Sequence, residues 1–112
     1  YKNEFLKSKN KNLKHYYDPI SGSDKSNCIM TDVWVSMGEK GNNKKKYFKN
    51  FTVNNKIISK AAKNVIFMHC LPAKRGQEVT SDVLDGKNSV VLMQAKNRMY
   101  IQQAILIYVL KK

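Results

Sequence analysis

The sequence is poor in cysteine, with only Cys28 and Cys70 among its 112 residues. Two such cysteines offer no disulfide framework and lack the paired spacing of a zinc site. Both lie in apolar segments, which suits reduced thiols, so we expect a cytoplasmic protein without a structural metal. The longest apolar run, residues 104–110, is far too short to span a bilayer, and we expect no membrane partner. The sequence also shows no secretory signal, no glycine-rich phosphate loop and no hydrolase triad pattern, so we expect no cofactor.

Acidic residues are scarce as well: 8 Asp and Glu stand against 21 Lys and Arg, which gives a net charge of +13. Such a charge raises the question of nucleic acid binding. The basic residues, however, are almost all lysines mixed with asparagines, and residues 44–46 form the only lysine triplet. This pattern favours solvated lysines over a nucleic-acid-binding surface. A basic nucleic-acid-binding module is therefore kept only as an alternative.

A chain of 112 residues corresponds to one small domain. Strand-like and helix-like segments alternate along it, which predicts an α/β fold with a parallel sheet flanked by helices. The run at 28–34 fits a strand buried on both faces, and the run at 95–110 fits a helix with one broad apolar face. The predicted strands are 13–17, 28–34, 65–68 and 89–93, and the predicted helices are the end of one at 1–11, then 44–51, 53–62, 80–84 and 95–110. Residues 21–24 predict a loop, and Asn54 or Asn55 is expected to cap the helix that follows.

The segment 68–76 ends an apolar strand with reactive side chains. Ligands of open α/β sheets bind at the carboxyl ends of strands, so chemistry is expected here. Cys70 is a candidate nucleophile or hydrogen-bond donor, although most free cysteines are small buried hydrophobes. The bond from Leu71 to Pro72 is a candidate cis peptide that would turn a carbonyl toward a ligand. His69 is a possible base, but a lone histidine beside a strand is more often structural.

A second polar cluster follows the strand predicted at 28–34. Asp32 needs a cationic partner if it is buried, and a ligand ammonium or an arginine would serve. Ser36 adds a hydroxyl, and Gly38 permits a close approach of the backbone. Arg98, near the start of the last helix, has the planar fork that suits a carbonyl or phosphate oxygen, or it is an ordinary surface arginine.

Three segments resemble motifs of the ornithine carbamoyltransferases, in the same order and spacing. They are the Ser-Met-Gly loop at 31–38, the His-Cys-Leu-Pro segment at 68–76 and the Gln-Ala-Lys-Asn-Arg-Met segment at 94–99. The resemblance covers nearly the whole chain and is weakest before residue 24. Aspartate carbamoyltransferases share the fold but lack the cysteine segment, so the ornithine branch is favoured. The resemblance implies a Rossmann-like fold and places residues 1–112 in one partial domain, the amino-acid-binding half of the enzyme.

On the ornithine side, the resemblance implies that Asp32 and Ser36 hold the α-amino group of the substrate. The backbone of Met37 would lie near the substrate carboxylate. The reaction implied is attack of a neutral δ-amine on carbamoyl phosphate, giving citrulline and phosphate.

On the carbamoyl side, the resemblance implies that Cys70 lies near the δ-amine and the carbamoyl group. The carbonyl of Leu71, before a cis bond to Pro72, would accept from the carbamoyl nitrogen. Arg98 would donate to the carbamoyl oxygen, and much of the rate would come from positioning.

The family binds carbamoyl phosphate mainly through an N-terminal domain with Ser-Thr-Arg-Thr and His-Pro-x-Gln segments, and neither segment occurs here. We therefore expect a piece of a longer, trimer-based enzyme that is inactive without that missing domain. Lys74, Met93 and Lys96 stand where the family commonly has a histidine, an acid and a glutamate. The last two replacements remove acids that could orient Arg98.

Three further interpretations stay open beside this one. A related carbamoyltransferase acting on putrescine or an acylated ornithine would carry similar motifs. An inert remnant of the enzyme would explain the departures at Lys74, Met93 and Lys96. The nucleic-acid-binding module predicts affinity that falls steeply with salt and depends on residues 44–46.

Overall fold

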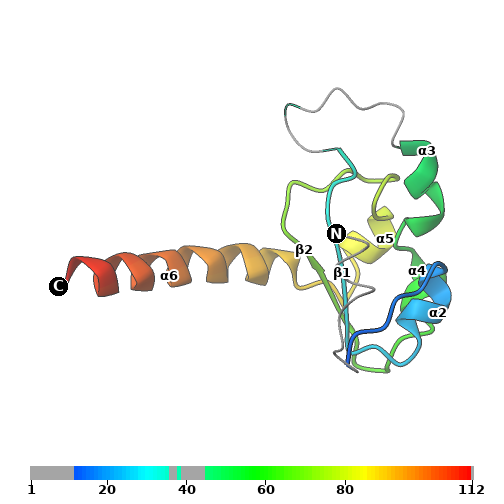
Figure 1. The fold of residues 1–112 in the computed structure, drawn as a ribbon, viewed down its shortest axis with the longest axis horizontal. Helices are drawn as coiled ribbons and strands as arrows, with labels where there is room; N and C mark the ends of the chain where they lie inside the picture. The colour runs from blue at the N-terminus through cyan, green and yellow to red at the C-terminus, as the bar shows by residue number, and fades with distance from the viewer. Residues whose placement is uncertain (1–11, 36–37, 39–44, 112) are drawn as a thin grey trace.

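The structure, a computed structural model, describes residues 12–35, 38 and 45–111. Its described part contains a two-stranded parallel sheet of β1 (Cys28–Thr31) and β2 (Ile66–His69). The register pairs Cys28 with Ile66 and ends with Thr31 opposite His69. On the other edge of β2, Phe67 forms a single parallel bridge with Ser89. The predicted α/β class with a parallel sheet is confirmed (Figure 1).

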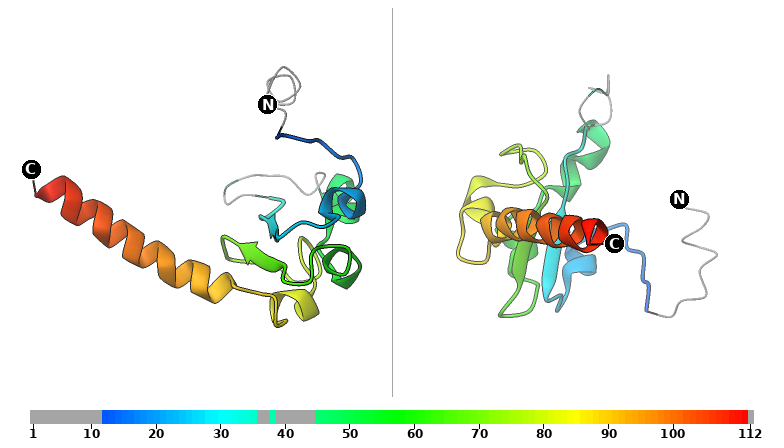
Figure 2. Two further views of the ribbon diagram at one scale, coloured as in Figure 1. Left: turned by 90° about the horizontal axis from the view of Figure 1, so that it is seen from below. Right: turned by 90° about the vertical axis from the view of Figure 1, so that its left-hand side faces the viewer.

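Short helices gather beside the sheet, and one long helix leaves it as an arm (Figures 1 and 2). The helices are α2 (Pro19–Ser23), α3 (Lys45–Phe48), the 3-10 turn η1 (Lys49–Phe51), α4 (Asn55–Ile58), α5 (Ser81–Leu84) and α6 (Val91–Leu110). No helix in the described residues is both long and apolar enough to cross a membrane.

The core lies between β2, α4, α5 and the first residue of α6. Phe67 is fully buried at its centre. Around it pack Val53, Ile57, Val79, Val83, Leu84 and Val91. The predicted cap of α4 is confirmed, because the Asn54 side chain accepts from the amides of Lys56 and Ile57.

The N-terminal part of the described chain differs from the prediction in two places. Residues 13–17 form no strand. Residues 19–23 form the helix α2, although a loop was predicted at 21–24. The cause is local: the Asp18 side chain accepts from the Ser21 amide, and Pro19 starts the helix with a suitable φ. These capping interactions outweigh the poor helix propensity of the Ser-Gly-Ser segment. The helix end predicted at 1–11 lies outside the described residues.

The later elements also differ in extent and exposure. β1 ends at Thr31, and its residues alternate between exposed and partly buried, so it is not buried on both faces. α4 ends at Ile58, before the predicted 62. The strand predicted at 89–93 is reduced to the bridge at Ser89, because α6 begins at Val91.

The prediction of a single apolar face on the last helix is wrong. Apolar side chains occur around α6, and only Val91 is buried. Leu110, near the end of the arm, is 80% exposed.

Candidate functional site at the carboxyl ends of the strands

The sheet register brings Asp32 and Cys70 together. Thr31 and His69 are the last paired residues, so the next residue of each strand leaves the sheet at the same edge. There the Cys70 thiol donates a hydrogen bond of 2.9 Å to Asp32 Oδ1. The amide of Val33 donates to the same oxygen over 2.7 Å. The predicted proximity of the acid and the thiol is confirmed.

The two groups shift each other's protonation in opposite directions. The hydrogen bond from Cys70, with that from the Val33 amide, lowers the pKa of Asp32 below its ordinary value. The hydrogen bond to Asp32 raises the pKa of the Cys70 thiol, with smaller contributions from burial and the negative charge of Asp32. Near neutral pH the pair is therefore a carboxylate and a neutral thiol. Such a thiol is a hydrogen-bond donor rather than a nucleophile.

Arg98 reaches the same place from the first part of α6. Its Nη1 donates to the main-chain oxygen of Cys70 over 3.3 Å. One turn earlier, the Gln94 side chain accepts from the His69 amide over 3.0 Å, which fixes this part of the helix to the end of β2. Nothing in the sequence indicates this role for Gln94, since its partner lies 25 positions away.

The chain bends sharply after Cys70, in a segment that we call the Cys70 turn (residues 70–74). The Leu71–Pro72 peptide is cis, as predicted, and Leu71 has a φ of +56°. The Leu71 amide donates to His69 Nδ1 over 2.8 Å. An open depression of about 570 Å³ lies against this turn, and its walls are Cys70, Leu71, Pro72, Ala73, Arg75, Leu84, Ala95 and Arg98.

A smaller hollow of about 250 Å³ has Asp32 in its lining. The rings of Trp34 and Phe48 stack there, with centroids 6.1 Å apart. Thr31, Val33 and Phe51 complete the lining. The order of residues in the sequence does not predict this stack, because it depends on the packing of α3 and η1 against the loop after β1.

Ser36 and Met37, both expected to bind the substrate, lie outside the described residues. Gly38 is described and has a φ of +88°, a conformation that glycine adopts without strain.

The three departures from the expected motifs lie in the Cys70 turn and in the first part of α6. Lys74 contributes its main-chain amide, which donates to Glu78 Oε1. Met93 is 62% exposed. The Lys96 ammonium lies 5.9 Å from the centroid of the Tyr100 ring. Arg98 contacts the Cys70 carbonyl although positions 93 and 96 carry no acid.

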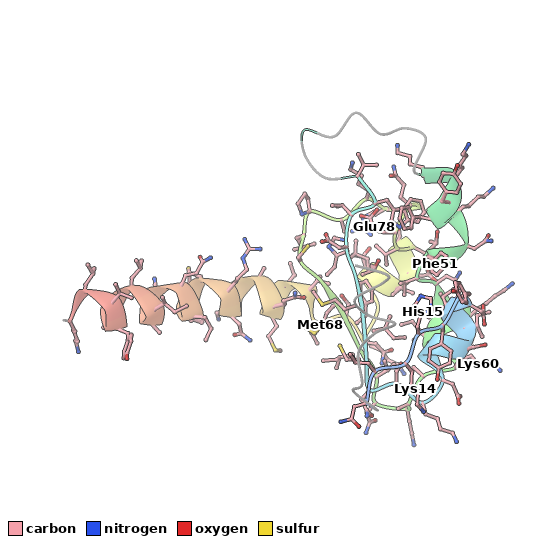
Figure 3. All side chains as sticks on the ribbon, viewed as in Figure 1. Lys14, His15, Phe51, Lys60, Met68 and Glu78 are labelled. Carbon is pink, nitrogen blue, oxygen red and sulfur yellow. The ribbon has the colours of Figure 1, made fainter. Side chains whose placement is uncertain are left out.

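His69 and Glu78 are both fully buried beneath the Cys70 turn. Glu78 lies within the packed body of the chain, as Figure 3 shows. His69 was predicted to be either a base or a structural residue. Its complete burial makes it the structural one. Glu78 was not predicted, and its only signal was an acid directly before the apolar Val79. Within residues 12–35, 38 and 45–111, no group of three His, Cys, Asp or Glu residues could hold a metal ion.

A family model described as the aspartate/ornithine carbamoyltransferase Asp/Orn-binding domain matches residues 1–109. An ornithine carbamoyltransferase of Methanococcus vannielii is 45% identical over 97 residues, which is 84% of this chain and 32% of the relative. That of Ruthia magnifica is 39% identical over 109 residues, which is 96% of this chain and 36% of the relative. This chain therefore spans about a third of the length of these curated relatives.

Solved structures agree with the sequence comparisons. The crystal structure of anabolic ornithine carbamoyltransferase from Campylobacter jejuni matches with a TM-score of 0.79 and 37% identity, over 87% of this chain and 32% of that one. Ornithine carbamoyltransferase from Pyrococcus furiosus matches with a TM-score of 0.73 and 46% identity, over 80% of this chain and 29% of that one.

Proposed function

The chain belongs to the aspartate/ornithine carbamoyltransferase family as an Asp/Orn-binding domain, and we propose that it forms the ornithine-binding part of an ornithine carbamoyltransferase. In that reaction the δ-amine nitrogen of ornithine bonds to the carbamoyl carbon of carbamoyl phosphate. The bond from that carbon to the bridging phosphate oxygen breaks, and phosphate leaves. The nitrogen loses a proton, and citrulline results. The observation that carries the proposal is the meeting of Asp32, Cys70 and Arg98 at one edge of the sheet.

Asp32 is the proposed ligand of the ornithine α-ammonium. Its two hydrogen bonds from described residues both go to Oδ1, which leaves Oδ2 for a charged donor from the substrate. The lowered pKa of Asp32 keeps it negative at neutral pH. Ser36 and Met37 are proposed to complete the ammonium and carboxylate contacts.

Cys70 is proposed to orient the δ-amine without forming a covalent bond. Its raised pKa keeps the thiol protonated, and the hydrogen bond to Asp32 fixes the sulfur. A fixed sulfur can hold the amine lone pair toward the carbamoyl carbon, which is a positioning effect.

Arg98 and Leu71 are proposed to hold the carbamoyl group. Arg98 uses one donor on the Cys70 carbonyl, and a guanidinium has five N–H donors, so others remain for the carbamoyl oxygen. As negative charge develops on that oxygen, the fixed donors stabilise it. The Leu71 carbonyl, beside the cis bond, would accept from the carbamoyl nitrogen.

Turnover is proposed to need a carbamoyl-phosphate-binding portion supplied with these 112 residues. The Ser-Thr-Arg-Thr and His-Pro-x-Gln segments expected for that task are absent from this sequence, and the chain spans about a third of its relatives. We also propose a trimer-based assembly, and a cytoplasmic location that suits the two free thiols.

Ornithine binding to the chain gives the direct test. Calorimetry should detect L-ornithine, and Asp32→Ala should weaken or abolish that binding. Putrescine and N-acetylornithine are the matched competitors, since each lacks a free α-amino acid group. Equal binding of all three would refute selectivity for free ornithine, and no loss in Asp32→Ala would refute the role of Asp32.

Co-expression with the carbamoyl-phosphate-binding portion of a relative tests the reaction itself. We expect citrulline only when both parts are present. A folded, associated pair that makes no citrulline would instead favour the inert remnant, for which the replacements at Lys74, Met93 and Lys96 are the structural reason.

A further inference from the structure

The Cys70 turn rests on two polar side chains that are completely buried, His69 and Glu78. Burial of such groups costs free energy unless their polar atoms find partners. A buried ionic pair is also weak evidence for a role in stability, because apolar side chains of similar volume often serve as well or better. The contacts of the two side chains point to a different role.

His69 holds the start of the turn. Its Nδ1 accepts from the Leu71 amide over 2.8 Å, so this nitrogen carries no proton. The ring proton then sits on Nε2, which lies 3.4 Å from Glu78 Oε1. That distance is a close polar contact, although the two atoms are not aligned as a hydrogen bond.

Glu78 holds the end of the turn. The same Oε1 that faces His69 accepts from the Lys74 amide over 2.5 Å. One carboxylate oxygen therefore contacts His69, which binds the amide at position 71, and directly binds the amide at position 74. Its other oxygen has no partner in the described part of the chain. The position of this carboxylate therefore does not satisfy both of its own oxygens.

We propose that Glu78 is a positioning residue: through His69 and the Lys74 amide it holds the Cys70 turn in the shape that presents Cys70 to Asp32 and Arg98. The proposal deepens the proposed function, since it concerns the same site. The positioning role of Glu78 can be tested without ornithine, because the reactivity of the Cys70 thiol reports on whether its hydrogen bond to Asp32 is kept.

Asp85 offers a matched control on the outer side of the same segment. It forms a two-pronged pair with Arg75, and the two side chains are 63% and 49% exposed. Exposed pairs of this kind contribute little. Both acids therefore contact the 70–75 segment, but only Glu78 binds an amide of the turn from inside the protein.

The first experiment measures alkylation of Cys70 by iodoacetamide across the alkaline pH range, in a Cys28→Ser background. Glu78→Leu keeps the volume but removes the acceptor, so the turn relaxes and Cys70 loses its fixed hydrogen bond to Asp32. We expect the alkylation profile to shift to lower pH and the rate near pH 8 to rise several-fold. Glu78→Gln keeps an acceptor oxygen, and its rate should stay within about twofold of the parent, as should that of Asp85→Asn. A folded Glu78→Leu protein with an unchanged profile would overturn the proposal.

The second experiment uses the chain with Glu78 and His69 intact, so it does not depend on whether Glu78→Leu folds. Nitrogen NMR should show His69 protonated at Nε2 and bare at Nδ1, and the amides at positions 71 and 74 should be protected from hydrogen exchange. Unprotected amides, or a proton on Nδ1, would overturn the proposal. If ornithine fails to bind while the thiol and NMR results hold, the proposed function fails and the positioning role stands.

Discussion

Thr31 and His69 face each other at the last register position of the parallel sheet, and this pairing sets the position of the whole site. Each strand ends there, so the residues that follow, Asp32 and Cys70, meet over 2.9 Å although 38 positions separate them. A parallel sheet places the carboxyl ends of its strands at one edge. The site is thus a consequence of register, and register errors would separate its acid from its thiol.

Replacing Asp32 should make the Cys70 thiol more acidic. The hydrogen bond to Asp32 is the main cause of the raised pKa of Cys70, so Asp32→Ala should lower that pKa toward its ordinary value. Titration of the thiolate ultraviolet absorbance in a Cys28→Ser background would measure the shift. Asp24→Ala is the control. Asp24 is the C-cap of α2 and precedes the first residue of β1, whereas Asp32 follows the last. Equal titration curves for the parent and Asp32→Ala would contradict the prediction.

Stability should fall at acidic pH because three aspartates have lowered pKa values in the folded protein. The main cause in each case is a side-chain hydrogen bond. Ser21 donates to Asp18, Cys70 to Asp32, and Arg75 to Asp85. Each pKa lies below the ordinary 3.8, so between the two values the unfolded state binds more protons and stability rises with pH. The contribution is complete above the unfolded pKa and is lost as pH falls through the folded pKa.

Urea unfolding from about pH 2 to about pH 6 would measure this acid dependence. Asp18→Asn is the informative variant, because asparagine keeps an acceptor for the start of α2 but does not titrate. Its stability should vary less steeply with pH than that of the parent. A slope identical to the parent would show that Asp18 has no part in the acid dependence.

Phe67 should carry much of the stability of the chain. It is fully buried at the centre of the core, so Phe67→Ala leaves a cavity and should cost about 3–5 kcal/mol of unfolding free energy. Met30, in the neighbouring strand, is 58% exposed and serves as control. Met30→Ala should change stability by about 0.5 kcal/mol or less. Equal losses in the two variants, measured by equilibrium urea unfolding, would show that the core is not centred on Phe67.

More of the candidate site than of the secondary structure around it could be predicted from the sequence. A thiol and an acid after two apolar strands, and an arginine at the start of a helix, could be placed together because strand ends share an edge. The buried partners could not be placed this way. Nothing in the spacing links Gln94 to the His69 amide or Glu78 to the Lys74 amide, since both contacts depend on how the segments pack.

The misassigned elements have local physical causes. Residues 89–93 are an apolar run whose period does not separate strand from helix. Phe67 bonds only to Asn88 and Val90 on that side, so pairing stops and α6 begins. In α2, the Asp18 cap and Pro19 decide the outcome against the low propensity of Gly22.

Arg98 should affect turnover much more than folding or ornithine binding. Its side chain is exposed, and its proposed task is to stabilise charge on the carbamoyl oxygen, so Arg98→Ala should leave the thermal midpoint and ornithine affinity nearly unchanged. In the presence of a relative's carbamoyl-phosphate-binding portion, kcat should fall by about 10² to 10³. Arg98→Lys keeps the charge but loses the planar fork that can hold the Cys70 carbonyl and the substrate together, so it should recover only part of the rate. Gln102→Ala, one turn further along α6, controls for effects on the helix and should keep the parent rate. A loss of ornithine affinity that matches the loss of kcat/KM in Arg98→Ala would place this arginine on the ornithine side instead.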